Sequence, residues 1–242
     1  MGELSEAWEQ NAAAWIAWAR EPGHDSYWQF HRDLFLELVP LPSGRTLDVG
    51  CGEGRLARDL AALGHDVAAV DASPTMLAAA RDAAPEMELH LADAAELPFA
   101  DASFGLVIAF MSFQDVDDLD GAMREAARVL APGGWLCLAI VHPTNSAGSF
   151  EERTVTSQFV IDGSYLDEST IDATFERDGL AMRFVSRHRP LQAYTGALAG
   201  NGLLIEQLRE PALPESGFTG EHSPRWRRIP LFLHLRALKP AS

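Results

Sequence analysis

Basic residues are scarce in this sequence. Lysine and arginine together number 19 against 35 acidic residues, which gives a formal net charge of −16. A protein that binds a phosphate backbone needs a continuous basic track. The one short basic cluster, at residues 225–228, is typical of a solvated loop or of a carboxylate partner. We therefore expect no nucleic acid partner.

Cysteine and long apolar runs are scarce as well. Cys51 and Cys137 have neither zinc-site spacing nor the pattern of a disulfide framework, which favours a reducing, cytoplasmic location. The longest apolar run, residues 135–141, is too short to span a bilayer. The start of the sequence lacks the basic segment of a signal peptide. We expect no membrane contact and a cytoplasmic protein.

The remaining composition is that of an ordinary globular chain, with 47% hydrophobic and 22% charged residues. A length of 242 residues suits a single domain over 1–242. Within residues 1–40, apolar side chains recur at helical spacing on either side of a break at residues 21–23, which predicts two helices. Their position before the next region makes them candidates for a lid.

Residues 44–142 alternate between short apolar runs and amphipathic segments. Helices are expected at 54–64, 74–84 and 118–130. Strands are expected at 45–49, 66–70, 86–91, 104–110 and 135–142. This alternation predicts an α/β fold with a doubly wound parallel sheet, and ligands beyond the carboxyl ends of its strands.

The pattern changes after residue 145. Strands are expected at 154–161 and 180–188, and we interpret 145–190 as an insertion on the substrate side. Residues 190–238 then read as a helix at 190–199 followed by the last strands, at 203–208 and 230–238.

A glycine-rich turn, Gly50 to Gly54, joins the first strand to the first helix of this region. Glycines allow a ligand to approach the backbone closely. The dinucleotide motif would need a third glycine at Arg55, so the turn departs from it. Asp48, beside the turn, would repel a pyrophosphate but suits the sulfonium and ammonium of S-adenosylmethionine. This favours the methyl donor, with a nicotinamide-dependent oxidoreductase as the alternative.

Two further acids follow the next strands. Asp71 ends the second strand, where a carboxylate can accept both ribose hydroxyls of a nucleotide. Asp93, followed by Ala94, ends the third strand, where it can accept from an adenine amino group. Acids at the carboxyl ends of three successive strands indicate a nucleoside site.

Several motifs in order resemble those of class I S-adenosylmethionine-dependent methyltransferases. They are Leu47-Asp48-Val49-Gly50-Cys51-Gly52-Glu53-Gly54, Val70-Asp71-Ala72-Ser73-Pro74-Thr75-Met76-Leu77, Ala92-Asp93-Ala94-Ala95-Glu96-Leu97-Pro98-Phe99, Ser103-Phe104-Gly105-Leu106-Val107-Ile108 and residues 125–134. The resemblance is strong over 44–142 and weak over 188–238. One departure is Gly105, where that family usually has an acid.

The resemblance implies a Rossmann-like fold with a mostly parallel seven-stranded sheet, N-terminal helices and an insertion after the fifth strand. It also implies that S-adenosylmethionine is bound and S-adenosylhomocysteine is released. The residues expected to bind the cofactor are Asp48, Gly50, Cys51, Gly52, Asp71, Ala72, Met76, Asp93, Ala94, Phe110 and Met111.

Candidate chemical groups follow the fifth strand and lie in the flanking regions. His142 comes directly after that strand, and its ordinary pKa near neutrality suits a general base. The alternative for His142 is a cap on the strand. The residues expected to line an acceptor pocket are Tyr27, His31, Tyr165, His188 and Tyr194.

Acids also cluster after the fourth strand, at Asp115, Asp117, Asp118 and Asp120. Some relatives use magnesium to hold vicinal oxygens of the acceptor, but these spacings define no ligand set. Asp117 and Asp118 equally suit the cap of the following helix. We assign no metal site, and keep magnesium as an alternative.

The sequence thus predicts methyl transfer from S-adenosylmethionine to a small-molecule acceptor, at a hydroxyl or carboxylate oxygen. Transfer to nitrogen or carbon of a small metabolite is an alternative. So is a protein that binds the cofactor without catalysis. The oligomeric state is left open.

Overall fold

The computed structural model of the protein describes residues 2–214 and 223–241. Its centre is a seven-stranded sheet in the order β10-β11-β5-β4-β1-β2-β3. The strands are β1 Arg45–Val49, β2 Asp66–Asp71, β3 Glu88–Leu91, β4 Phe104–Phe110, β5 Leu130–Val141, β10 Leu204–Arg209 and β11 Phe232–Leu238. β1 to β5 pair in parallel, whereas β11 runs antiparallel to both its neighbours. The expected mostly parallel sheet is confirmed.

Helices cover both faces of the sheet because successive strand residues point to opposite sides. In β4, Val107 packs into a core with α5 (Leu119–Val129) and α7 (Leu191–Gly200), while its neighbour Ile108 packs into a second core with α2 (Arg32–Leu36) and α3 (Arg55–Ala62). The helices are α2 Arg32–Leu36, α3 Arg55–Ala62, α4 Pro74–Ala83, α5 Leu119–Val129, α6 Pro143–Ser146 and α7 Leu191–Gly200. The doubly wound arrangement predicted from the alternation is therefore present.

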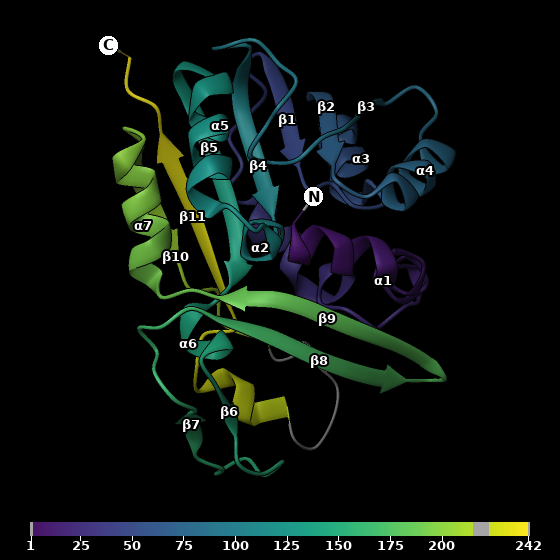
Figure 1. Ribbon diagram of the computed structural model, residues 1–242, viewed down its shortest axis with the longest axis vertical. Helices are drawn as coiled ribbons and strands as arrows, with labels where there is room; N and C mark the ends of the chain where they lie inside the picture. The colour runs from purple at the N-terminus through teal and green to yellow at the C-terminus, as the bar shows by residue number, and fades with distance from the viewer. Residues whose placement is uncertain (1, 215–222, 242) are drawn as a thin grey trace.

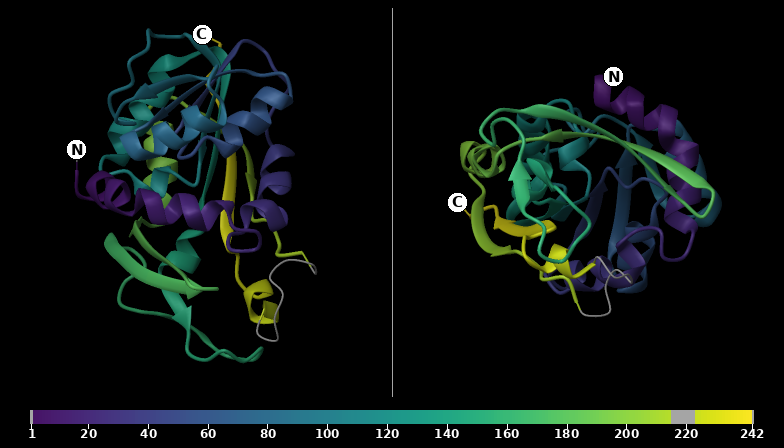
Figure 2. Two further views of the ribbon diagram at one scale, coloured as in Figure 1. Left: turned by 90° about the vertical axis from the view of Figure 1, so that its right-hand side faces the viewer. Right: turned by 90° about the horizontal axis from the view of Figure 1, so that it is seen from below.

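The amino-terminal segment forms α1 (Glu3–Arg20) and a short π-helix, η1 (Tyr27–His31), that continues into α2. Figures 1 and 2 show α1 lying across the lower ends of β1, β2 and β4, which are their carboxyl ends. Two side chains from the core hold it there. The Asp117 carboxylate accepts a hydrogen bond from the Leu4 amide at 3.1 Å, and Glu9 of α1 accepts from the Thr75 hydroxyl at 2.6 Å.

The segment after β5 contains two hairpins, β6 Gly148–Phe150 with β7 Phe159–Ile161, and β8 Ser169–Arg177 with β9 Leu180–His188. The strand expected at 180–188 is confirmed. The strand expected at 154–161 is wrong over its first half, because residues 153–156 form a bend and a turn. β8 was missed because most of its residues are exposed and polar, so its sequence lacks apolar alternation.

Gly105, the departure noted within β4, has a local steric reason. A Cβ at this position would lie 2.2 Å from the backbone oxygen of Ser43, in the segment that enters β1. The strand itself spans the residues expected, so the missing acid leaves β4 unchanged. None of the helices within 2–214 and 223–241 is both long and apolar enough to cross a bilayer.

Candidate active site

One cavity of about 1260 Å³ lies at the carboxyl ends of the central strands. α1, η1 and the β8–β9 hairpin contribute to its walls from the other side (Figure 2). Every residue that the sequence predicts to bind the cofactor lines this cavity: Asp48, Gly50, Cys51, Gly52, Asp71, Ala72, Met76, Asp93, Ala94, Phe110 and Met111. Binding of a cofactor by these residues remains a prediction.

Asp48 is the last residue but one of β1 and is only 1% exposed. Its Oδ2 atom has no hydrogen-bond partner among the described residues. Burial, and then the nearby negative charge of Asp71, raise the pKa of the Asp48 carboxyl to about 7. A buried carboxylate oxygen without a partner costs free energy unless a cation or a donor pairs with it. This side chain therefore fits a cationic ligand in the cavity.

The glycine turn is held close to the turn that follows β4. A Cβ on Gly50 would lie 2.4 Å from the Cβ of Ser112, and Gly50 has a left-handed φ of +74°. Ser112 donates from its hydroxyl to the Val49 carbonyl at 2.7 Å. Met111 next to it is one of the few non-glycine residues with positive φ, at 56°. Strained backbone of this kind is common at ligand sites, where surrounding contacts maintain it.

Asp71, the last residue of β2, and Asp93, which follows β3, accept hydrogen bonds from backbone amides of nearby turns. Asp71 accepts hydrogen bonds from the Gly52 amide at 2.7 Å and from the Ser73 amide at 2.9 Å. Burial nevertheless raises its pKa above the ordinary value, against the lowering effect of these amides. Asp93 accepts from the Ala95 amide at 2.9 Å. Each carboxylate retains lone pairs for a ligand hydroxyl or amino group.

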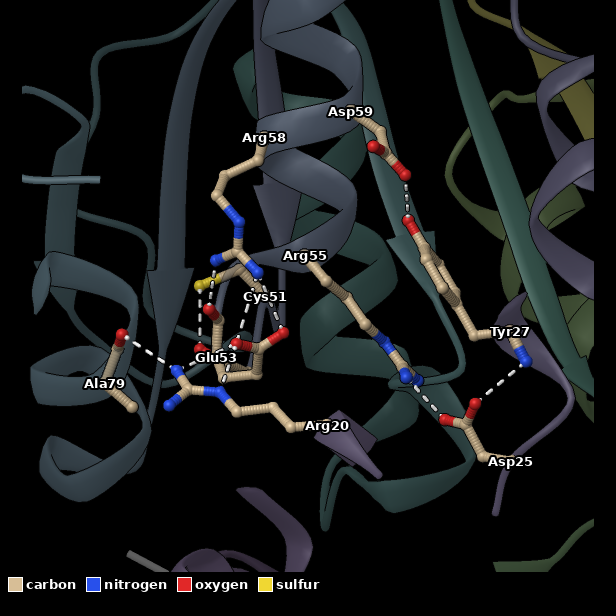
Figure 3. Close-up of polar contacts among 10 residues, drawn as sticks. Arg20, Asp25, Tyr27, Cys51, Glu53, Arg55, Arg58, Asp59 and Ala79 are labelled. Carbon is tan, nitrogen blue, oxygen red and sulfur yellow. Dashed lines mark hydrogen bonds and ion pairs between the residues drawn. The ribbon is translucent and has the colours of Figure 1, made fainter. Parts of the chain in front are cut away.

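An ion-pair network centred on the buried Glu53 side chain supports the glycine turn (Figure 3). Glu53 lies within the turn and pairs with Arg20 at the end of α1 and with Arg58 of α3, both at 3.0 Å. Because Arg20 comes from α1 and Glu53 from the turn, the network fastens the N-terminal helix to the predicted cofactor site.

A second set of polar contacts positions the segment after α1. Arg55, the residue found in place of the third glycine, pairs with Asp25 and lies over the ring of Tyr27 at 4.2 Å from its centroid (Figure 3). The Tyr27 hydroxyl donates to Asp59 of α3 at 2.7 Å. The pairing of Arg55 with Asp25 could not be predicted from the sequence, since Asp25 lies in a segment without helical or strand periodicity.

The acceptor residues predicted from sequence divide into two groups. Tyr27 and His31 line the cavity. Tyr165, His188 and Tyr194 are not among its lining residues. The Tyr165 hydroxyl accepts from the Leu191 amide at the start of α7, and the His188 ring bonds the Ser146 hydroxyl and the Tyr165 carbonyl. Tyr194 is buried in the main core. These three side chains make structural contacts, so of the residues expected to line an acceptor pocket the structure brings only Tyr27 and His31 to the cavity.

The cavity wall also contains aromatic side chains that were not among the predicted site residues. They are Trp8, Trp15, Trp18, Phe175, Phe184, Trp226 and Phe232. Phe175 and Phe184 come from the β8–β9 hairpin, where their ring centroids lie 5.6 Å apart. Because Phe175 lies in the strand that was missed, no sequence signal pointed to it.

His142, the expected general base, is held as a helix cap. Its Nδ1 accepts from the Thr144 amide at 3.0 Å, which caps α6, and its Nε2 lies 2.9 Å from Glu210. It does not line the cavity, and burial lowers its pKa although Glu210 acts to raise it. With both ring nitrogens engaged, this geometry fits capping rather than proton transfer to a ligand.

Substitution of His142 should therefore affect stability through the cap. We expect His142→Ala to lower the free energy of unfolding by about 1 kcal/mol, and His142→Asn, whose side chain also caps helices, to restore most of it. Chemical denaturation of the two variants measures this. A base at His142 would instead make His142→Asn as inactive as His142→Ala in any methyl-transfer assay.

The acids after β4 have separate roles. Asp118 caps α5 by accepting from the Gly121 amide at 2.8 Å, as the capping alternative predicted. Asp117 instead caps α1. Asp115 is buried at the cavity wall, and burial raises its pKa to about 7. No group of acids, histidines or cysteines in the described part of the chain is arranged to hold a metal ion.

Comparison with known proteins adds to this geometry. Residues 47–138 match a methyltransferase domain family. The chain is 43% identical over 128 residues to a demethylmenaquinone methyltransferase of Chlorobaculum parvum, an alignment that covers 50% of this chain and 51% of that protein. The chain thus spans about half the length of the curated relatives it matches.

Solved structures extend the likeness over most of the chain. An S-adenosylmethionine-dependent methyltransferase from Mesorhizobium loti superposes with a TM-score of 0.69 at 26% identity, covering 85% of this chain and 95% of that one. The [4+2]-cyclase SpnF shares the fold with a TM-score of 0.66 at 20% identity, covering 99% of this chain and 96% of the other. Fold, motifs and family match agree: residues 47–138 form a methyltransferase domain, and the chain has the fold of S-adenosylmethionine-dependent methyltransferases.

Proposed function

We propose that this protein transfers the methyl group of S-adenosylmethionine to a hydroxyl or carboxylate oxygen of a small molecule. The observation that carries the proposal is Asp48 beside the glycine turn, whose buried Oδ2 has no hydrogen-bond partner in the described part of the chain. The cofactor's ammonium and sulfonium supply the positive charge that this carboxylate needs. A pyrophosphate in the same place would meet the repulsion of Asp48 and Asp71.

The size of the cavity supports a second ligand beside the cofactor. Its volume of about 1260 Å³ exceeds the roughly 300–1000 Å³ of common small-molecule pockets. Aromatic walls from α1 and the β8–β9 hairpin suit a planar, apolar acceptor. Several relatives are demethylmenaquinone methyltransferases by name, so quinol-type rings belong in the first set of acceptors to be tested.

In this mechanism the chain mainly positions its ligands and excludes water. Bound S-adenosylmethionine supplies an activated methyl group. Asp48 and the glycine turn hold its methionine part, Asp71 its ribose, and Asp93 with Ala94 its adenine. Tyr27 and Phe110, whose ring centroids lie 5.6 Å apart, close the cavity over the position where the acceptor oxygen approaches. Alignment of the reacting atoms in a dry site supplies roughly 7–11 kcal/mol in favourable cases.

Thermal melting with candidate nucleotides tests the donor. S-adenosylhomocysteine should raise the melting temperature, whereas NAD should not. A shift with NAD alone would identify an oxidoreductase. The likeness to SpnF shows the fold alone, and a fold does not determine the reaction. Tight cofactor binding with no methylated product from any oxygen, nitrogen or carbon acceptor would identify a chain that binds the cofactor without methyl transfer.

Cofactor affinity should depend on pH through Asp48. Its pKa of about 7 means that the carboxylate gains a proton as the pH falls through this value, and a neutral carboxyl no longer attracts an ammonium. We therefore expect the dissociation constant of S-adenosylhomocysteine to increase by about tenfold for each pH unit below 7. The increase ends at the pH where the affinity no longer depends on the Asp48 charge. Isothermal titration calorimetry at pH 8 and pH 5.5 measures the change, and a constant affinity would contradict it.

A further inference from the structure

Two histidines from opposite ends of the chain meet at the cavity wall. Nε2 of His31, in η1, lies 2.8 Å from Nε2 of His234, in β11, and the two rings stack with 9° between their planes. Both side chains are almost fully buried, at 1% and 0% exposure. His31 lines the cavity, whereas His234 lies behind it. Neither histidine has a role in the positioning of the cofactor and the acceptor proposed for this cavity.

The distance between the rings restricts their protonation. Two imidazole nitrogens at 2.8 Å share one proton, so one ring donates and the other accepts. Burial lowers the pKa of both histidines, that of His234 to about 4. The charged groups that act on the pair, Arg55 on His31 and Arg209 on His234, are cations and also disfavour a positive ring. Both rings are therefore neutral at neutral pH.

The hydrogen bonds around the pair indicate which ring donates the shared proton. The Ser26 hydroxyl can donate a hydrogen bond to His31 Nδ1 when that nitrogen carries no proton, and His31 Nε2 is then the protonated nitrogen that donates to His234. We assign a proton to His234 Nδ1, which leaves its Nε2 as the acceptor and makes His31 Nε2 the donor. Nδ1 of His31 then carries the unprotonated lone pair of its ring. It lies 3.5 Å from the hydroxyl of Ser26, which also lines the cavity.

The position of His31 suits a reacting hydroxyl. Its ring centroid is 4.7 Å from that of Phe110, the last residue of β4 and a member of the predicted cofactor site, and 3.8 Å from that of Phe232. These rings place His31 between the predicted cofactor end of the cavity and its apolar acceptor end. A base at this point can reach an acceptor oxygen directly or through the Ser26 hydroxyl.

We propose that His31 and His234 form a proton-accepting pair, in which His31 Nδ1 takes the proton of a hydroxyl acceptor and His234 is a positioning residue. This rests on the proposed methyl transfer and makes an aryl or alkyl hydroxyl, rather than a carboxylate, the acceptor class. The hydroxyl oxygen forms a bond to the methyl carbon, the carbon–sulfur bond breaks with its electron pair left on sulfur, and the hydroxyl proton moves to His31. The charge on His31 is then stabilised through its hydrogen bond to His234.

The first test examines the tautomers. Long-range nitrogen–proton NMR spectra of the full chain with bound S-adenosylhomocysteine should show His31 protonated at Nε2 and His234 at Nδ1, both neutral from pH 6 to pH 8. A proton on Nδ1 of His31 would leave no lone pair facing the cavity and would overturn the proposal.

The second test compares acceptors that differ in the need for a base. Release of S-adenosylhomocysteine is measured with phenol, catechol and a naphthoquinol, which carry a proton at pH 7.5, and with thiophenol, which is largely ionised. His31→Gln should lower kcat for the hydroxyl probes by about 10²-fold with little change in KM, and should change thiophenol methylation far less. The kcat of the wild-type protein should fall only in acid, below the ordinary histidine pKa of 6.5.

Variants of the second histidine separate positioning from packing. His234→Phe should reduce kcat for the hydroxyl probes, whereas His234→Gln, whose amide oxygen can accept from His31, should recover most of it. His65→Gln is the matched control, since His65 is also buried and bonded to a hydroxyl, that of Thr46 at 2.9 Å, but does not line the cavity. All variants are first checked for folding and for S-adenosylhomocysteine affinity.

The outcomes distinguish this proposal from the proposed function. Equal losses with the hydroxyl probes and with thiophenol would show that the histidines only pack, and would overturn the pair as a base. Cofactor binding together with methylation of thiophenol or of carboxylates, but of no hydroxyl probe, would overturn the acceptor class. Failure to bind S-adenosylmethionine at all would instead contradict the proposed function.

Discussion

Asp48→Asn is expected to weaken binding of S-adenosylmethionine by about 10²-fold, which corresponds to roughly 2.7 kcal/mol, while it makes the unliganded protein more stable. The substitution keeps the shape of the side chain and removes its charge. In the complex, the carboxylate charge that the substitution removes faces the positive charge of the bound cofactor. In the free protein, the same charge is buried and Oδ2 has no partner, so its removal relieves an unfavourable burial.

The stability change has a defined pH dependence. The pKa of Asp48 rises from 3.8 in the unfolded chain to about 7 in the folded one. A carboxyl with a raised pKa binds its proton more tightly when folded, so the stability of the free protein falls as the pH rises from about 4 to about 7. Asp48→Asn should therefore show its largest gain in melting temperature at pH 8 and almost none near pH 4.

Calorimetric titration and thermal melting of the two proteins at pH 8 and pH 5.5 measure both effects. Glu53→Gln serves as a comparison, since Glu53 is buried near the same turn but paired with Arg20 and Arg58. Removal of its charge should destabilise the protein. If Asp48→Asn destabilised the free protein and left the affinity unchanged, Asp48 would be a structural residue only.

Gly50→Ala is expected to destabilise the protein by about 3 kcal/mol or more and to abolish measurable cofactor binding. Two costs add at this position. An alanine must adopt a φ of +74°, and its Cβ would lie 2.4 Å from the Cβ of Ser112. To relieve the contact, the turns after β1 and β4 must separate, and both turns line the predicted cofactor site.

The chain offers a matched control for the two costs. Gly64 also has a left-handed φ, of +92°, but a Cβ there would have no atom within 4 Å. Gly64→Ala should therefore cost only the conformational part, about 1 kcal/mol. In the double variant Gly50→Ala with Ser112→Gly, the steric part should largely disappear, so a double-mutant cycle by urea denaturation isolates it. Equal losses for Gly50→Ala and Gly64→Ala would contradict the close approach of the two turns.

The local pattern of the sequence was sufficient to predict the central sheet and the order of its strands and helices along the chain. Apolar runs of five to eight residues alternating with amphipathic segments leave few topologies, because crossovers between parallel strands are right-handed and short. The same pattern placed Asp48, Asp71 and Asp93 at one edge, and the structure has them lining one cavity. The tight turn at Gly50 was also predicted, since a turn between a strand and a helix has a local signature.

The tertiary structure alone decided the roles of side chains whose partners lie far along the chain. His142 suited a base by its place after β5, yet Glu210 and the start of α6 occupy its ring. Asp117 was expected to cap the next helix and instead caps α1, 113 residues away. His31 and His234 are 203 residues apart, and no periodicity links them. Periodicity indicates which face of an element is buried, whereas the partner of a polar group depends on how the elements pack. That packing separates the residues that line the cavity from those that cap helices.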